Sequence, residues 1–203
     1  MFQPNRQTTP ENRAPGGISS QSLLAMSAIS FLFYLVLALL IYYFFFEEGI
    51  TTAFEHGYSA GYQISLGGLA GCLAAAVIMF LAGRPPVVGV MNDFYIVKVI
   101  SEVEFTPFDR IQLSLFAGVG EELLFRGAIQ PLLGIWITSF IFIGIHGYFK
   151  FKSTGHLLFG VMMFGLSVLL GYLFEYAGLI AAMSAHAVYD IVMLWWIKDR
   201  VLK

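Results

Sequence analysis

The feature that most constrains this chain is an apolar run of 24 residues from Leu23 to Phe46, which is interrupted only by Ser27 and Ser30. A segment of this length is long enough for an α-helix to cross the hydrocarbon core of a bilayer. It is also longer than the apolar core of a secretory signal peptide. We therefore expect a membrane-spanning helix in this part of the chain.

The composition extends this expectation to the whole chain. Apolar and aromatic residues (AVILMFWYC) make up 58% of the 203 residues and charged residues 12%, whereas a soluble domain carries about 25% charged residues. The net charge of −2 provides no basic surface for nucleic acid. The single cysteine, Cys72, can form neither an intrachain disulfide nor a thiolate metal cage. We therefore expect the lipid bilayer to be a partner of this chain.

Further apolar segments follow the first one. The sequence predicts about six transmembrane spans, at approximately 23–46, 64–82, 111–133, 132 or 135 to 149, 157–176 and 179–197. The last span ends on two tryptophans, which are typical of a membrane interface. Residues 1–21 are polar and are predicted to form a disordered cytoplasmic tail. We expect residues 22–203 to form a single all-α membrane domain, a polytopic helix bundle.

The basic residues orient this bundle. Ten of the eleven lysines and arginines lie in the N-terminal tail, in alternate loops or at the C-terminal end; the eleventh, Arg126, lies within a span. The opposite loops contain no lysine or arginine, and the charged residues in them are glutamates. Cytoplasmic loops carry the excess of positive charge in membrane proteins. The pattern predicts that both termini are cytoplasmic.

Two segments carry structural signals of their own. Residues 87–108 alternate apolar and charged side chains, which predicts either an amphipathic helix on the cytoplasmic face or a connector with one helical turn. In the second span, Gly67 and Gly71 form a G-x-x-x-G pattern. Small residues at this spacing let a neighbouring helix approach closely, and we expect this contact to be made within the bundle.

Ionisable side chains at membrane depth are costly, and they are therefore candidates for function. They lie on three predicted spans and comprise Glu121, Glu122, Arg126, His146, His186 and Asp190. His146 lies nearer to the cytoplasmic end of its span than the others. A pocket shared by these residues is expected to open toward the cytoplasm.

Helical spacing predicts different roles for Glu121, Glu122 and Arg126. Glu122 and Arg126 are four residues apart, so they share a helix face and can form an ion pair. Glu121 is rotated by about 100° from Glu122 and points elsewhere. One carboxylate is then neutralised while Glu121 remains available as a general base, with His146 as a possible partner.

The same reasoning applies to the two histidines. Phe142 lies four residues before His146, on the same face, where it can pack against the imidazole. Asp190 lies four residues after His186 and is expected to orient that ring. Two other interpretations stay open. The same groups can form structural ion pairs, or Glu121 and the two histidines can bind a catalytic zinc ion.

At these residues the sequence resembles the CaaX protease and bacteriocin-processing family, also called the Abi family, of intramembrane endopeptidases. The resemblance covers about residues 111–197. Three motifs carry it, in the order of that family and on separate predicted helices: Glu121-Glu122-Leu-Leu-Phe-Arg126, Phe142-Ile-Gly-Ile-His146 and His186-Ala-Val-Tyr-Asp190.

The resemblance implies a glutamate-dependent endopeptidase without a cofactor. Glu121 and His146 are then expected to activate a water molecule, and His186 with residue 190 to stabilise the oxyanion. Glu122 and Arg126 are expected to hold the scaffold. This chain departs from the family in carrying Asp190 where asparagine is usual. An ionised carboxylate cannot donate a hydrogen bond to an oxyanion, so Asp190 must be protonated or act by orienting His186.

The depth of these residues favours a hydrophobic or membrane-tethered polypeptide as substrate. The resemblance implies a bacterial plasma membrane as the location. A non-catalytic scaffold or immunity protein with the same fold is the alternative from another functional class.

Overall fold

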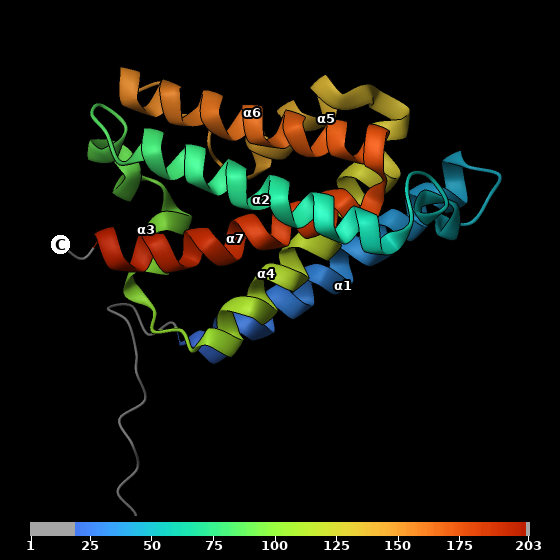
Figure 1. The fold of residues 1–203 in the computed structure, drawn as a ribbon, viewed down its shortest axis with the longest axis horizontal. Coiled ribbons are helices and arrows are strands. Elements are labelled where there is room, and N and C mark those ends of the chain that lie inside the picture. The colour runs from blue at the N-terminus through green and yellow to red at the C-terminus, as the bar shows by residue number, and fades with distance from the viewer. Residues whose placement is uncertain (1–18, 202–203) are drawn as a thin grey trace, which may run out of the picture.

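The computed structural model describes residues 19–201 and the side chains of residues 19–198 (Figure 1). Over these residues all regular structure is helical, which confirms the predicted all-α class. Most of the tail predicted at residues 1–21 lies outside the described residues. Its last two residues already belong to the first helix.

Four of the predicted spans are long helices. These are α1 (Ser20–Phe45), α2 (Ala60–Ala82), α6 (Thr154–Ala177) and α7 (Leu179–Val201). Each has at least 23 residues. At 1.5 Å per residue, such a helix is about 35 Å long, which exceeds the roughly 30 Å hydrocarbon core of a bilayer. The chain is therefore a multi-pass membrane protein.

The predicted third and fourth spans form one continuous apolar stretch of 39 residues. It consists of α4 (Pro107–Glu122), the π-helical segment η3 (Leu123–Ile129) and α5 (Gln130–Ile145). Gly134 breaks the helix inside α5 with φ 75° and ψ 168°, a conformation that glycine adopts at little cost. The part of α5 after this break is only about 16 Å long, roughly half of the hydrocarbon core.

The described residues therefore contain five candidate spans, and the prediction of six is wrong. The error lies in residues 132–149, where an apolar segment that looked like an independent span is a half-length helix continuing from α4 and η3. The cytoplasmic location of both termini stays a prediction.

The amphipathic helix predicted within residues 87–108 is confirmed in part, because a shorter one is present, and its location on the cytoplasmic face stays a prediction. The structure has two short helices here, the 3-10 helix η2 (Val88–Asp93) and α3 (Tyr95–Glu102). Apolar side chains of α3 and of the connection that follows it point inward. They form a small cluster with side chains of α1 and α4: Val99, Val103 and Phe105, with Leu23 and Leu113 packed against them.

Helix α7 is the most buried of the candidate spans and packs against α2, α3, α4 and α6 (Figure 1). A Cβ atom on Gly67 would lie 2.2 Å from the carbonyl oxygen of Ala181, and one on Gly71 would lie 2.4 Å from that of Ala185. The G-x-x-x-G pattern therefore lets α2 lie directly against α7, as the sequence predicts. This contact positions the helix that carries His186 and Asp190.

Candidate functional site

The site begins where α4 changes into η3. In η3 the backbone N–H of Gln130 donates to the carbonyl oxygen of Phe125, five residues earlier, which is the π-helical pattern. The hydroxyl of Tyr42 on α1 donates to the carbonyl oxygen of Gly127 at 3.0 Å, within the same segment. π-Helical turns are rare and are frequent at functional sites. Here the π-helix directly follows Glu121 and Glu122.

Glu122 and Arg126 form a completely buried ion pair. Their side chains have no exposed area, and Nε of Arg126 donates to Oε2 of Glu122 at 3.0 Å. The guanidinium also donates to Oγ of Ser167 on α6 at 2.8 Å and to Oε1 of Gln130 at 3.5 Å. A buried charge is tolerated only when its hydrogen-bonding groups have such partners. The pairing expected from helical spacing is present, and it ties η3 to α6.

The other carboxylate oxygen of Glu122 holds His186. Nδ1–H of His186 donates to Oε1 of Glu122 at 2.8 Å. This bond leaves Nε2 of His186 as the ring nitrogen that faces Glu121, whose Oε2 is 3.9 Å away. Sequence spacing assigns the orientation of His186 to Asp190, but the shortest contact of this ring is with Glu122.

Asp190 lies on the opposite side of the same ring. Its Oδ2 atom is 3.6 Å from Nε2 of His186, a looser contact than the bond to Glu122. Asp190 is therefore placed with the site as expected, next to the ring nitrogen that faces the cavity. Asp190 contacts His186 as expected, but at a longer distance than Glu122 does.

Glu121 and His146 face one another from different helices. Oε2 of Glu121 lies 3.4 Å from Nε2 of His146, and 12% of the Glu121 side chain is exposed. Nδ1–H of His146 donates to the carbonyl oxygen of Phe142 at 2.6 Å. Because this bond occupies Nδ1, Nε2 is the ring nitrogen that faces Glu121. Catalytic contacts are often longer in an empty site and shorten when substrate binds.

The ring of Phe142 lies between the two histidines. Its centroid is 4.3 Å from that of His146 and 6.1 Å from that of His186. It also packs at 4.9 Å against Phe125, edge to face. The expected contact with His146 is present, and the same ring also lies against His186.

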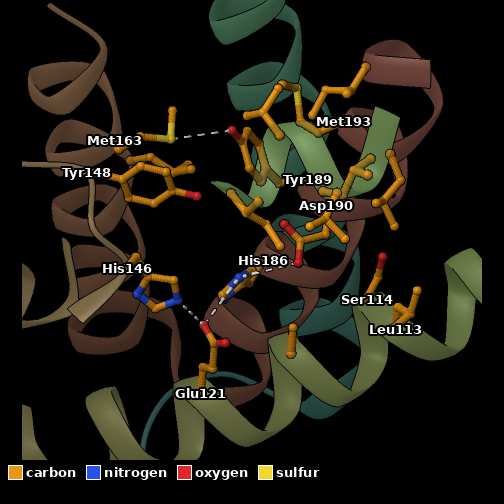
Figure 2. A pocket seen from close by; sticks show the side chains of 18 of the residues that line it. Leu113, Ser114, Glu121, His146, Tyr148, Met163, His186, Tyr189, Asp190 and Met193 are labelled. Atoms are coloured by element: carbon orange, nitrogen blue, oxygen red, sulfur yellow. Dashed lines mark hydrogen bonds and ion pairs between the residues drawn. The ribbon is translucent and has the colours of Figure 1, made fainter. Parts of the chain in front are cut away.

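These side chains line one cavity of about 370 Å³ (Figure 2). Glu121 enters it from α4, His146 from the end of α5, and both His186 and Asp190 from α7. The remaining wall is mostly apolar and includes side chains from α1, α3 and α6. Glu122 and Arg126 lie behind the cavity wall, where they hold His186 in place.

Sequence reasoning missed six polar residues of this cavity: Ser27, Ser30, Ser114, Tyr148, Ser167 and Tyr189. Ser114 lies seven residues before Glu121, and this spacing indicates a shared face of α4. Its buried hydroxyl has no hydrogen-bond partner among the described residues. Tyr189 donates weakly to Sδ of Met163 at 3.9 Å. Tyr148 lies in the non-helical connection after α5, where no periodic pattern could reveal it.

His156, the remaining histidine at this end of the helices, lies outside the cavity. It contacts Oδ2 of Asp93 at 3.0 Å and Oγ of Ser153 at 2.8 Å. Among residues 19–198, no group of three or more histidine, cysteine, aspartate or glutamate side chains is arranged to hold a metal ion.

The fold and the site define a multi-pass membrane protein with two glutamates, two histidines and an aspartate gathered among its candidate spans. Residues 104–192 match the family described as type II CAAX prenyl endopeptidase Rce1-like. The match includes all three motifs, so the resemblance expected from the sequence is confirmed.

A protein of Bacillus subtilis (strain 168), described as uncharacterized protein YpbD, is 36% identical over 89 residues. These residues are 43% of this chain and 45% of that protein, so the chain spans less than half the length of the curated relative it matches. No solved structure matches this chain.

Proposed function

We propose that this protein is an intramembrane endopeptidase in which Glu121 and His146 activate the attacking water. The observation that carries this proposal is the 3.4 Å approach of Glu121 Oε2 to His146 Nε2 at the edge of a cavity lined by candidate membrane spans. A carboxylate and an imidazole at this distance can both bind one water molecule and share its proton. The match of residues 104–192 to the Rce1-like family supports the same chemistry.

In the proposed reaction, Glu121 removes a proton from water while the oxygen of that water attacks a peptide carbonyl carbon. The proton then passes, directly or through His146, to the departing amine when the C–N bond breaks. The net change is the addition of one water molecule across the peptide bond. No cofactor is required for these steps.

His186 assists the same reaction from the opposite side of the cavity. When its ring is protonated, Nε2–H can donate to the oxyanion of the tetrahedral intermediate. The Asp190 carboxylate, 3.6 Å from this nitrogen, offsets the charge of the ring. Glu122 and Phe142 are positioning residues, since Glu122 contacts His186 and Phe142 contacts His146. Arg126 acts through Glu122, to which it is bonded.

The proposed substrate is a hydrophobic or membrane-tethered polypeptide. Two features support this class: the mostly apolar wall of the cavity and its location among the candidate spans. We propose the bacterial plasma membrane as the location, supported by the relative from Bacillus subtilis. The family description names a CAAX prenyl endopeptidase, but no feature of the cavity described above specifies a prenyl group.

The test is cleavage of a mixed pool of membrane peptides by the purified protein in liposomes, with new termini mapped by mass spectrometry. Wild-type protein is compared with Glu121→Gln, with the exposed-site control Glu47→Gln, and with chelator-treated wild type. We expect cleavage by wild type and by the control, with or without chelator, and none by Glu121→Gln. No wild-type cleavage would favour a non-catalytic scaffold, and loss on chelation would favour the zinc alternative.

A further inference from the structure

Tyr148 lies at the cavity, two residues after His146, in the connection between α5 and α6. Its ring stacks on the His146 imidazole with a centroid distance of 5.9 Å and an interplanar angle of 5°. The rings of Phe159 and Phe94 contact it at 5.6 Å and 5.9 Å. Three aromatic neighbours therefore fix the direction of the phenol ring.

The hydroxyl of Tyr148 is directed into the cavity, toward the side that carries His186 and Asp190 (Figure 2). Among the described side chains it has ring contacts but no hydrogen bond. Burial, followed by the carboxylates of Asp190 and Glu121, raises the pKa of Tyr148. The phenol therefore stays protonated at neutral pH and has a hydrogen to donate.

The proposed peptidase reaction needs such a donor, and this inference rests on that proposed function. Attack on a peptide bond places a negative charge on the former carbonyl oxygen, which must be stabilised by donors directed at it. The residues around the reacting position are rich in acceptors instead, because Glu121 and Asp190 are both carboxylates. Nε2 of His186 lies between these two carboxylates, at 3.9 Å and 3.6 Å.

We propose that the Tyr148 hydroxyl is a catalytic hydrogen-bond donor to the peptide carbonyl oxygen as it becomes an oxyanion. The phenol keeps its proton throughout. Water adds its oxygen to the carbonyl carbon, its proton passes to Glu121, and the C=O π electrons move to the oxygen that Tyr148 contacts. When the C=O bond re-forms, the amine leaves with the proton and the Tyr148 hydrogen bond weakens.

The first test is Tyr148→Phe, which removes the hydroxyl and keeps the stacked ring. Removal of one oxyanion donor lowers kcat by about 100- to 1,000-fold in enzymes with preformed sites. We expect a fall in kcat of at least about tenfold, with KM changed by less than about twofold. The matched control is Tyr95→Phe, at a tyrosine that is 74% exposed and outside the cavity, and it should behave as wild type.

A second measurement separates catalysis from structure. A phosphinic peptide built on a mapped cleavage sequence imitates the tetrahedral intermediate, and Tyr148→Phe should weaken its binding by the same factor as kcat. Binding of the uncleaved peptide, measured in the Glu121→Gln background, should not change. Equal kcat and equal phosphinate affinity in wild type and Tyr148→Phe would overturn the role of Tyr148. The proposed peptidase function would survive that result, because it depends on wild-type cleavage and its loss in Glu121→Gln.

Discussion

Oε1 of Glu122 lies 2.8 Å from Nδ1 of His186, so a carboxylate at the end of α4 is bonded to an imidazole on α7. The other oxygen of the same carboxylate accepts a hydrogen bond from Arg126. Both oxygens of Glu122 are therefore engaged, and the side chain is wholly buried. The preceding residue, Glu121, points to the cavity instead. Two adjacent glutamates thus have different environments because they occupy different faces of one helix.

Replacing Arg126 with methionine should strongly destabilise the protein. The change leaves the Glu122 carboxylate buried without its cation, which typically lowers the free energy of unfolding by about 3–5 kcal/mol. Thermal or denaturant unfolding of the detergent-solubilised protein measures this loss. Glu122→Gln combined with Arg126→Met should cost less than the sum of the single changes, because neither charge then remains. Additive losses would contradict the coupling of the two residues.

Asp190→Asn should retain cleavage within about tenfold of wild type, since an amide can still contact Nε2 of His186 and can itself donate to an oxyanion. Asp190→Leu removes every polar contact at this position and should lower kcat by about 10- to 100-fold. The comparison requires the cleavage assay with a mapped peptide. If the leucine variant were as active as the asparagine variant, Asp190 would have no part in the reaction.

Gly71→Ala should destabilise the bundle because the new Cβ would lie 2.4 Å from the carbonyl oxygen of Ala185. Forcing α2 and α7 apart should lower the free energy of unfolding by about 1–3 kcal/mol. Gly68→Ala is the matched control on the same helix, because a Cβ there has no neighbour within 4 Å. Alanine also has the higher helix propensity. The control should therefore unfold at or above the wild-type temperature.

Phe142→Leu should strongly lower the rate of cleavage while the protein still folds. The ring sits 4.3 Å from the His146 imidazole, and a misplacement of about 1 Å in a catalytic group can cost about 100-fold in rate. We expect kcat to fall by about 10- to 100-fold. Phe140→Leu, on the exposed side of α5, provides the control. An unchanged kcat in Phe142→Leu would mean that other contacts fix the histidine.

Much of the fold was predictable because its signals are local. The length of an apolar run determines whether a helix can cross the bilayer, which is why α1, α2, α6 and α7 were predicted close to their observed bounds. The break at Gly134 was not predicted. Glycine occurs both within helices and at breaks between them. The sequence around Gly134 therefore did not distinguish two separate spans from one interrupted stretch.

In the site, too, local contacts could be predicted from the sequence and long-range contacts could not. The ion pair of Glu122 with Arg126 follows from a spacing of four residues on one helix, and the sequence alone determined it. The bond of Glu122 to His186 joins residues 64 positions apart, and the hydroxyl of Tyr148 reaches the cavity from a connection without a periodic structure. These relations depend on how α4, α5 and α7 pack. They could be seen only in the tertiary structure, because the distance in space between two side chains on different helices cannot be inferred from their separation in the sequence.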